Sequence, residues 1–418
     1  MHRLDGLVPL ASLIAIALCI AACSSDSHDG PTTPPPTGAT IDPTVALGVG
    51  RGSACLLNAD ETVACWGANE SGEVGAGDTH AFESLPVVTS GHAFAAISTY
   101  DRSTCGLTGA GAVYCWGNLP QSDPTVAATT TSEPTLQSSP VAFKSITVGE
   151  FYACGLDAGG VAYCWGLNQF GQLGIGDSSG RGAPTRVATS VTFASIEAGF
   201  RHTCGLAPSG AAYCWGSNVD GSLGTGDPIG FITGIPAPVQ GSLSFTSLSL
   251  GAMSTCGVVA SGSAYCWGDN SSGEDGTGVS GRSLITQPSL VIGGINFKSI
   301  YPSRSNTVGQ STCGVATDGT AYCWGLNHHG QLGSVVQGTC PNFTPDSTGQ
   351  FPACNVTPAP VPGLPAVAVI IPAIDHSCAI TVAKSVVCWG DNSLGQLGDG
   401  TATSRATPQP VVGLSRVP

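Results

Sequence analysis

The chain has 418 residues, of which only 10% are charged, and it is rich in glycine (59) and proline (29). This composition favours a turn-rich all-β protein over a helical one. The formal net charge is −14 and lysines are scarce, so the clustered basic residues that nucleic-acid binding requires are missing. We therefore expect no nucleic-acid partner.

The N-terminal residues have the form of an export signal. A weakly basic start precedes the apolar stretch 7–20, which is short for a transmembrane span. The stretch ends in Ile-Ala-Ala-Cys23, which resembles the lipobox of bacterial lipoproteins. The resemblance implies that residues 1–22 are removed and that Cys23 carries the lipid. Cleavage after Ala22 as an ordinary signal peptide and an uncleaved anchor remain the alternatives.

Residues 23–43 are rich in Pro, Thr, Ser and Asp and show no apolar period, so they are not expected to pack. A largely polyproline-like segment of this length reaches roughly 60 Å at most. We expect a disordered tether that holds a folded domain, residues 44–418, off a membrane. The predicted location is extracytoplasmic, at the outer membrane or cell surface of a bacterium, with the lipid as the one membrane attachment.

The rest of the chain consists of seven repeats. Cys-Trp-Gly occurs seven times, at intervals of 49 to 65 residues, and another cysteine lies ten positions before each of these cysteines. An apolar strand precedes each cysteine pair and a Pro-Val strand follows it, which gives about four short strands per unit. Units of this length and number predict an all-β, seven-bladed β-propeller, a closed ring with short and protected sheet edges.

The C-x9-C spacing indicates a disulfide-bonded hairpin. In the fourth repeat, Ala-Pro-Ser-Gly210 suits a type I turn followed by a glycine at positive φ. Counting outwards from this turn puts Cys204 opposite Cys214, with Cα atoms about 4.5 Å apart, a separation that a disulfide spans. Glu61 and Lys384 replace the glycine in the first and last hairpins, which predicts different turns there.

These hairpins predict one disulfide per blade, and an exported protein sits where disulfides persist. Structural zinc sites prefer cysteines two to four residues apart, so a metal site is the weaker alternative. Each bridge is expected to add roughly 2.5–3 kcal/mol in the chain-entropy model. Two further cysteines share one insertion and predict an eighth bridge. The predicted pairs are Cys55–Cys65, Cys105–Cys115, Cys154–Cys164, Cys204–Cys214, Cys256–Cys266, Cys313–Cys323, Cys340–Cys354 and Cys378–Cys388.

Other repeated side chains are interpreted as structural. Tyr and Trp beside the second cysteine are expected to pack between blades rather than to form a sugar-binding or cation-binding surface. The asparagine of Trp-Gly-x-Asn is expected to brace its loop as an Asx-type turn, with calcium coordination as the alternative. His328 and His329 have no carboxylate nearby in the sequence, so metal binding is not favoured. His202 and His376 hold equivalent repeat positions, which favours a structural role.

Residues 165–176, Trp-Gly-Leu-Asn-Gln-Phe-Gly-Gln-Leu-Gly-Ile-Gly, resemble the W-G-x-N-x-x-G-Q-L-G-x-G pattern of the RCC1 repeat family, named for a regulator of chromosome condensation. The resemblance covers nearly all of residues 44–418 and implies a seven-bladed propeller. Family members include a nucleotide exchange factor for a small GTPase, ubiquitin-ligase modules and a secreted bacterial β-lactamase inhibitor, which implies protein recognition on one face. Further copies lie at residues 324–333 and 389–398, and weaker ones at 72–75, 221–224 and 273–276.

Three segments depart from the repeat and are interpreted as insertions: residues 119–140, 301–311 and 334–360. Loops held by a rigid scaffold commonly carry function, so specificity is expected there. Replacing 334–360 by a short Gly-Ser turn is expected to leave the propeller folded, because loop length affects stability weakly. The candidate partner-binding residues are Phe343, Phe351, Tyr301 and Arg304.

Taken together, these features predict a monomeric, extracytoplasmic, membrane-tethered binding or scaffold protein whose partner is a protein or, alternatively, a glycan. The common hydrolase, metalloprotease and phosphate-loop motifs are missing, so we predict no catalytic residue, cofactor or metal. One alternative is an envelope polysaccharide lyase or hydrolase, which carboxylates or histidines clustered at the channel mouth would favour. The other is an RCC1-type guanine nucleotide exchange factor, which requires the export signal to be misread.

Overall fold

The computed structural model describes residues 46–418, except for 90, 126, 282–283, 305–309, 337, 341–349, 415–416 and 418. The predicted signal peptide, the predicted lipidation site Cys23 and the predicted tether lie outside the described residues, as does Phe343. The described residues all belong to one compact unit. Within the described part of the chain, no helix has the length and apolar character needed to cross a membrane.

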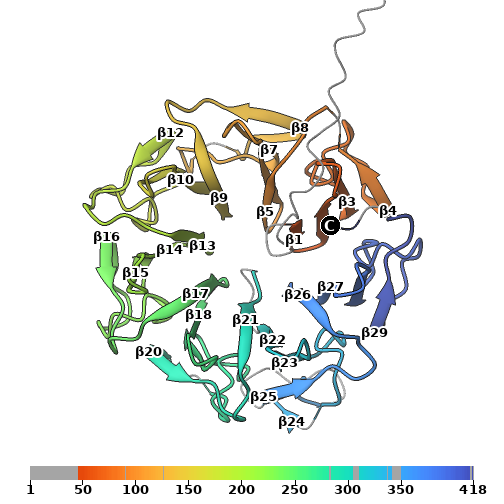
Figure 1. The fold of residues 1–418 in the computed structure, drawn as a ribbon. Helices are drawn as coiled ribbons and strands as arrows, with labels where there is room; N and C mark the ends of the chain where they lie inside the picture. The colour runs from red at the N-terminus through yellow and green to blue at the C-terminus, as the bar shows by residue number, and fades with distance from the viewer. Residues whose placement is uncertain are drawn as a thin grey trace, which may run out of the picture. The chain divides into compact units, whose positions relative to one another are not determined.

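Seven antiparallel sheets stand around a central axis, each built from strands that are consecutive in the chain (Figure 1). The first strand of each blade is innermost and faces the axis. Blades one to four are β1 (Leu47–Val49), β2 (Ser53–Leu57), β3 (Val63–Ala68) and β4 (Phe82–Val88); β5 (Ala96–Tyr100), β6 (Ser103–Leu107), β7 (Val113–Asn118) and β8 (Thr130–Gln137); β9 (Phe143–Gly149), β10 (Tyr152–Asp157), β11 (Ala162–Gly166) and β12 (Arg181–Arg186); β13 (Ser195–Ala198), β14 (His202–Leu206), β15 (Ala212–Ser217) and β16 (Ile232–Pro238).

Blades five to seven are β17 (Phe245–Leu250), β18 (Ser254–Val259), β19 (Ala264–Gly268) and β20 (Ile285–Leu290); β21 (Phe297–Pro302), β22 (Ser311–Ala316), β23 (Ala321–Leu326), β24 (Gly338–Thr339) and β25 (Ala353–Pro360); β26 (Val367–Pro372), β27 (His376–Thr381), β28 (Val386–Gly390) and β29 (Arg405–Pro410). Blade six has a fifth strand because β24 pairs with the outer edge of β25. The predicted seven-bladed propeller with about four strands per blade is confirmed.

Each hairpin has the predicted register and disulfide. Cys204 pairs directly with Cys214, and their Cα atoms lie 4.1 Å apart. All sixteen cysteines of the described residues lie in the eight expected pairs. The disulfide therefore joins the two central strands of every blade, and the eighth bridge, Cys340–Cys354, joins the segment that carries β24 to the start of β25.

The prediction that the first and last hairpins use different turns is wrong. Gly210 has a φ of 84° and closes its turn by donating its N–H to the carbonyl of Ala207. Glu61 and Lys384 hold the same position with φ of 67° and 61°, and Glu61 donates to Asn58 in the same way. Because the strand register fixes the turn, these two residues adopt the left-handed conformation despite their side chains.

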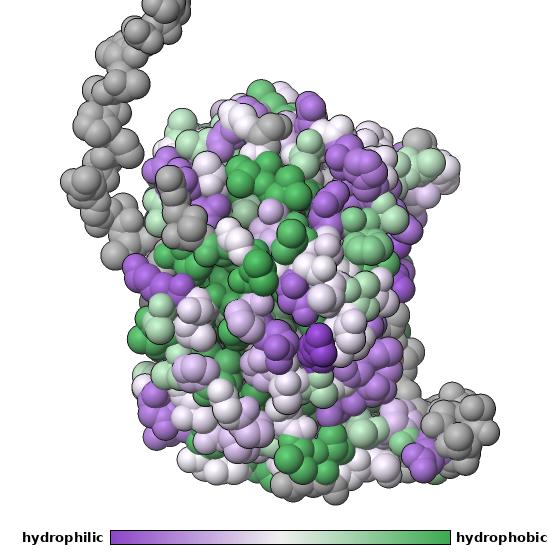
Figure 2. All heavy atoms as spheres, turned by 90° about the vertical axis from the view of Figure 1, so that its right-hand side faces the viewer, coloured by the Kyte–Doolittle hydropathy of each residue, from purple (hydrophilic) through white to green (hydrophobic). Residues whose placement is uncertain are grey.

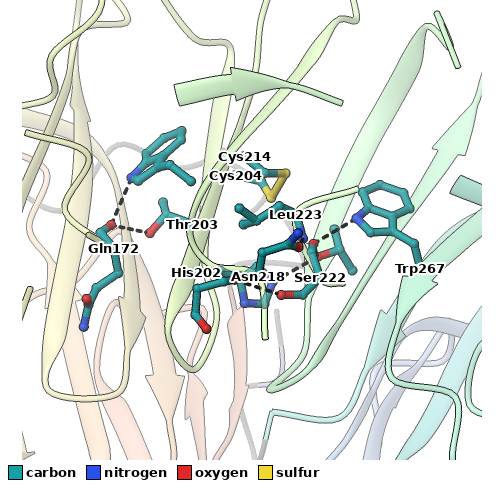
Figure 3. The surroundings of a disulfide bond; sticks show 12 residues. Gln172, His202, Thr203, Cys204, Cys214, Asn218, Ser222, Leu223 and Trp267 are labelled. Carbon is teal, nitrogen blue, oxygen red and sulfur yellow. Dashed lines mark hydrogen bonds between the residues drawn. A yellow bond between two sulfur atoms is a disulfide. The ribbon is translucent and has the colours of Figure 1, made fainter. Parts of the chain in front are cut away.

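The core lies between blades, where the disulfide of one blade packs on aromatic rings of the next. Cys204 and Cys214 share a buried cluster with Phe245 and Trp267 of blade five. Trp267 donates its indole N–H to the carbonyl of Ser222 at 2.9 Å (Figure 3). The predicted packing of tryptophan between blades is confirmed. The equivalent indole-to-carbonyl pairs are Trp66–Gln396, Trp116–Glu73, Trp215–Gln172, Trp324–Glu274 and Trp389–Gln331.

Trp165 departs from this pattern. Its buried indole nitrogen has no hydrogen-bond partner among the described residues. The acceptor at the other joints is a carbonyl in the Gly-Gln-Leu-Gly loop of the preceding blade, and blade two lacks that loop. The missing hydrogen bond therefore follows from the missing loop.

The repeated asparagine braces its loop, as predicted. Asn168 accepts the N–H of Leu173 at 2.9 Å through its side-chain oxygen, and its amide nitrogen donates to the carbonyls of Asp177 and Ser179. The same bond to the residue five positions ahead forms in all six copies, at Asn69, Asn168, Asn218, Asn270, Asn327 and Asn392.

The bounds of the predicted insertions need correction. Residues 130–137 form β8 and residues 353–360 form β25, which are the outer strands of blades two and six. Tyr301 and Pro302 end β21, and Ser311 begins β22. The inserted segments are therefore 119–129, 303–310 and 334–352. Replacing the whole of 334–360 would remove β25 and expose the edge of β23, so a replacement that tests the inserted segment has to stop before β25.

Candidate functional site

The three inserted segments leave the ring at one end. They connect β7 to β8, β21 to β22, and β23 to β25. In a blade of alternating antiparallel strands, the connection from the first to the second strand and that from the third to the fourth lie at the same end. We name this end of the ring the insertion face.

A central cavity of about 480 Å³ opens between the innermost strands of the blades. Its lining is mostly serine, threonine and aliphatic residues, such as Ser98, Thr147 and Ile300. The charged side chains among the described lining residues are Glu197, Lys298 and Arg304. A cluster of carboxylates or histidines at the channel would favour an enzyme. Among the described lining residues, Glu197 is the one carboxylate, and no histidine is present.

Arg304 reaches across this cavity from blade six. Its guanidinium donates to the carboxylate of Glu197 in blade four at 2.8 Å and to the carbonyl of Thr99 in blade two at 3.3 Å. Burial raises the pKa of the Glu197 carboxyl, and the charge of Arg304 opposes that shift. Arg304 was predicted to bind a partner, but its guanidinium forms these hydrogen bonds inside the ring. Tyr301, a second candidate, lines the same cavity from β21.

The described ends of the third inserted segment are held by strand pairing and by a disulfide. Gly338 and Thr339 pair with Cys354 and Ala353, and the Cys340–Cys354 bridge closes behind them. The sulfur of Cys340 lies 3.6 Å from the carbonyl oxygen of Ser272 in blade five. Phe351, in the same segment, is 40% exposed. Of the four candidates, Phe351 is the one that the structure shows as an exposed aromatic side chain on a braced segment.

The first inserted segment covers part of blade three. Gln121 donates its N–H to the carbonyl of Phe151, and a small pocket of about 210 Å³ lies beside it. Arg201 stacks over the ring of Phe170 at 4.4 Å and lies 3.8 Å from the carboxylate of Glu150. This part of the insertion face therefore combines an exposed cation with aromatic surface.

The buried histidines hold structural positions. His202 lies 2.9 Å from the hydroxyl of Thr255 in the next blade, and burial lowers its pKa to about 3. His376 is fully buried and its pKa falls to about 4 for the same reason. Both imidazoles are thus neutral at ordinary pH.

The sequence analysis missed a carboxylate beside the two adjacent histidines. Asp375, in the first connection of blade seven, lies 3.3 Å from Nε2 of His328 and 3.7 Å from Nε2 of His329. The equivalent positions of blades one and two hold Glu70 and Arg102, which form an ion pair. The sequence does not show which loops meet at a joint, so this equivalence is visible only in the structure.

This geometry defines a disulfide-braced, seven-bladed β-propeller with its irregular segments on one face. Two family models described as "Regulator of chromosome condensation (RCC1) repeat" match parts of the chain, and those parts therefore carry RCC1 repeats. One model matches residues 159–206, and the other matches 143–172, 193–222, 245–274, 308–331 and 374–396.

Among curated proteins, the chain is similar to pim1 of Schizosaccharomyces pombe, with 27% identity over 37% of this chain and 28% of that protein. It is also similar to the ultraviolet-B receptor UVR8 of Arabidopsis thaliana, with 24% identity over 44% of this chain and 38% of that protein. The chain thus spans less than half the length of these relatives in the matched regions.

Solved structures share the fold. Prp20p of Saccharomyces cerevisiae matches with a TM-score of 0.71 and 17% identity, over 85% of this chain and 87% of that one. Human WBSCR16 matches with a TM-score of 0.70 and 17% identity, over 84% and 94%. The ectodomain of the Physcomitrella patens receptor kinase CR4 matches with a TM-score of 0.51 and 19% identity, over 82% and 72%. At these identities the likeness concerns the fold.

Proposed function

We propose that this protein is an extracytoplasmic scaffold, tethered to a bacterial envelope, that recognises a protein partner through the insertion face. The observation that carries the proposal is the disulfide-braced segment 334–352, which holds the exposed Phe351 at the end of the ring where the other inserted segments also emerge. A braced segment loses little conformational entropy on binding. The described parts of the three segments differ from the repeat, so they can distinguish one partner from another.

Relatives of the same fold support a protein partner. Prp20p is described as binding Gsp1p and histones, and yeast RCC1 has been solved bound to Kap60. The repeated side chains of the present chain are used for folding: cysteines form bridges, tryptophans pack, and asparagines brace loops. Recognition at the irregular segments is therefore the simplest use of this scaffold.

The rim of the ring is a weaker candidate for the partner. Figure 2 looks onto the rim at β4 and β29 and shows apolar side chains interspersed with polar ones. Phe82, Leu85 and Val88 of β4 are exposed there. Apolar side chains scattered in this way are normal on protein surfaces and do not by themselves indicate an interface.

Disulfides support an extracytoplasmic location, because such bonds persist in oxidising compartments. Eight bridges in one chain would not survive in a reducing cytosol, which argues against a cytosolic exchange factor. The CR4 ectodomain, which is the extracellular part of a receptor kinase, has a fold similar to that of this chain. The enzyme alternative is disfavoured because the carboxylate at the channel, Glu197, is already paired with Arg304.

The tether is tested by changing Cys23 to Ala in the native host. The proposal expects the mutant to move to the soluble fraction or to remain an uncleaved precursor, since the lipid is the proposed membrane attachment. Fractionation and intact-mass measurement of the purified protein report both outcomes. A mutant that fractionates with the membrane and has the same mass as the wild type would overturn the lipoprotein assignment.

The partner site is tested by a deletion that respects β25. Residues 335–352 are replaced by a short Gly-Ser turn and Cys354 by Ser, so that the outer strand of blade six remains. The folded deletion is expected to lose the partner captured from envelope extract by the full chain. Retention of every captured protein would exclude this segment and direct attention to residues 119–129.

A point mutant sharpens the same test. Aromatic anchors commonly dominate interfaces, so Phe351→Ala is expected to weaken binding of the captured partner by about 30-fold, which corresponds to about 2 kcal/mol. Leu290→Ala is the matched control, because Leu290 is 50% exposed and ends the outer strand of blade five at the opposite end of the ring. Equal affinities of the two variants would contradict an anchor role for Phe351.

A further inference from the structure

Two imidazoles and a carboxylate meet at the joint between blades six and seven. His328 and His329 follow β23, and Asp375 lies between β26 and β27. One ligand atom from each of the three side chains lies within 4.8 Å of the others. The carboxylate oxygen Oδ1 of Asp375 lies 3.3 Å from Nε2 of His328 and 3.7 Å from Nε2 of His329.

The positions of His328, His329 and Asp375 recur at the other joints between blades, but the side chains that occupy them differ. At the joint between blades one and two, Arg102 pairs with Glu70 at 3.7 Å. At the joint between blades three and four, Arg201 stacks on Phe170. Each of these joints uses an arginine, which is not a metal ligand. The joint between blades six and seven instead presents two nitrogen donors and one oxygen donor, the set that zinc prefers.

One side chain holds both halves of this cluster together. Gln331 accepts the N–H of His329 at 2.9 Å and donates its amide nitrogen to the carbonyl of Ile374 at 3.0 Å. Ile374 directly precedes Asp375, whose own carbonyl accepts the N–H of Asp391 at 2.7 Å. The donor atoms are therefore positioned by the backbone of two blades rather than by the cluster itself.

The carboxylate is poised for a further contact. Oδ1 of Asp375 is buried and receives no hydrogen bond from the described residues. Donor atoms at about 2.1 Å from a tetrahedral zinc ion are roughly 3.4 Å apart, which is close to the two nitrogen–oxygen distances here. From this match we propose that His328, His329 and Asp375 bind a divalent metal of the zinc class at the joint between blades six and seven.

The site is open to solvent on one side. The side chains of His328 and His329 are 36% and 41% exposed, so an ion can enter without unfolding the joint. Three protein ligands leave one tetrahedral position for water or for a side chain of another molecule. The amide nitrogen of Gln331 lies 3.4 Å from Nδ1 of His328. Nδ1 must carry the proton when Nε2 binds a metal, and an amide nitrogen cannot accept that proton, so this neighbour does not support the ligand. The expected dissociation constant is therefore on the order of micromolar rather than that of a structural zinc site.

The test is calorimetric titration of the full chain with ZnCl₂ at about pH 7.5. The protein carries no histidine tag. The wild type is expected to bind one ion per chain. His328→Ala, His329→Ala and Asp375→Asn are each expected to weaken binding at least tenfold, with an unchanged circular dichroism spectrum.

His80→Ala is the matched control. His80 also lies near two carboxylates, at 3.1 Å from Asp78 and 3.8 Å from Glu83, but that cluster has a single imidazole and lies within one blade, in the β3–β4 loop and the start of β4. Its loss should leave the zinc isotherm unchanged. Absence of binding to the wild type, or an isotherm that survives all three substitutions at the joint, would overturn the proposal. An isotherm abolished by His80→Ala would assign the ion to the other cluster instead.

Discussion

Asp275 shows how one residue can depart from the repeat without changing its loop. In the equivalent position Leu173, Leu223 and Leu332 are fully buried between blades. Asp275 is equally buried, and its N–H still donates to Asn270 at 3.1 Å, so the backbone keeps its course. Neither carboxyl oxygen has a hydrogen-bond partner among the described residues. A carboxyl group therefore occupies a place shaped for leucine.

We predict that Asp275→Leu stabilises the protein by about 2 kcal/mol or more at neutral pH, because it removes an unpaired buried polar group and restores apolar burial. Burial, and secondarily Asp269, raises the pKa of Asp275 well above its ordinary value. The unfolded chain loses this proton above about pH 4, so the stability of the wild type falls as pH rises from there. Urea unfolding with intact disulfides, at pH values below and above about 4, measures the free energy of unfolding of both proteins.

Asp275→Asn separates the effect of the titrating carboxyl from the effect of burying a polar side chain. It removes the titrating group but keeps a buried polar side chain, so it should flatten the pH dependence. It should add little stability below about pH 4, and at neutral pH it should recover only the stability that the wild type loses through ionisation of Asp275 in the unfolded chain. Burial also raises the pKa of Glu274, so part of the pH dependence remains in both variants. A leucine variant no more stable than the wild type at neutral pH would show that the joint accommodates the acid by another route.

At the scale of the element, the hairpins were predictable and the outer strands were less so. The C-x9-C spacing determines which residues face each other, and Cys204 pairs with Cys214 as counted. Strands β8 and β25 were assigned to insertions because the segments 119–140 and 334–360 depart from the repeat. Each of these strands nevertheless contains a proline, Pro134 in β8 and Pro358 in β25. An outer blade strand is a sheet edge, where proline is tolerated. A proline near the middle of the outer strand in every blade was the available signal.

Glu61 and Lys384 make the hairpin turn itself testable. Both occupy the left-handed conformation that glycine takes in the other five turns. Replacing either by glycine removes the steric cost at the turn but adds freedom to the unfolded chain, so we expect a net gain of about 0.5–1 kcal/mol. Thermal unfolding of each variant measures it. Gly210→Ala is the opposite control: it should destabilise, and a neutral result there would contradict the argument.

At the scale of the molecule, the ring closes through side chains. β1–β4 form the first blade and β26–β29 the last, with no strand shared between them. Trp66 bridges the joint by donating to the carbonyl of Gln396 at 3.0 Å, and the two blades share one buried cluster. The sequence could predict that seven blades form a ring. It could not show which loops meet at each joint, so Asp375 and Glu197 were missed as partners of distant residues.

Ring closure is tested by comparing two tryptophans. Trp66→Phe removes the hydrogen bond to Gln396, whereas Trp165→Phe removes an indole nitrogen that has no hydrogen-bond partner among the described residues. The loss of volume is the same in both, so the difference isolates the hydrogen bond. We expect Trp66→Phe to cost about 1–2 kcal/mol more. Hydrogen exchange should rise in blades one and seven of this variant and remain slow in blades three to five; a uniform change would contradict closure at this joint.

Blades made of consecutive strands have one more consequence. Each unit carries its own staple, and the joint between the last and first blades uses the same indole-to-carbonyl bond as five others. The stability of the ring is therefore expected to depend little on which joint between blades holds the chain termini. A circular permutant that links residue 414 to residue 46 and opens the chain between β16 and β17 would keep every sheet and every bridge intact. The order in which a gene encodes the seven blades can accordingly be permuted by whole blades without changing the folded structure.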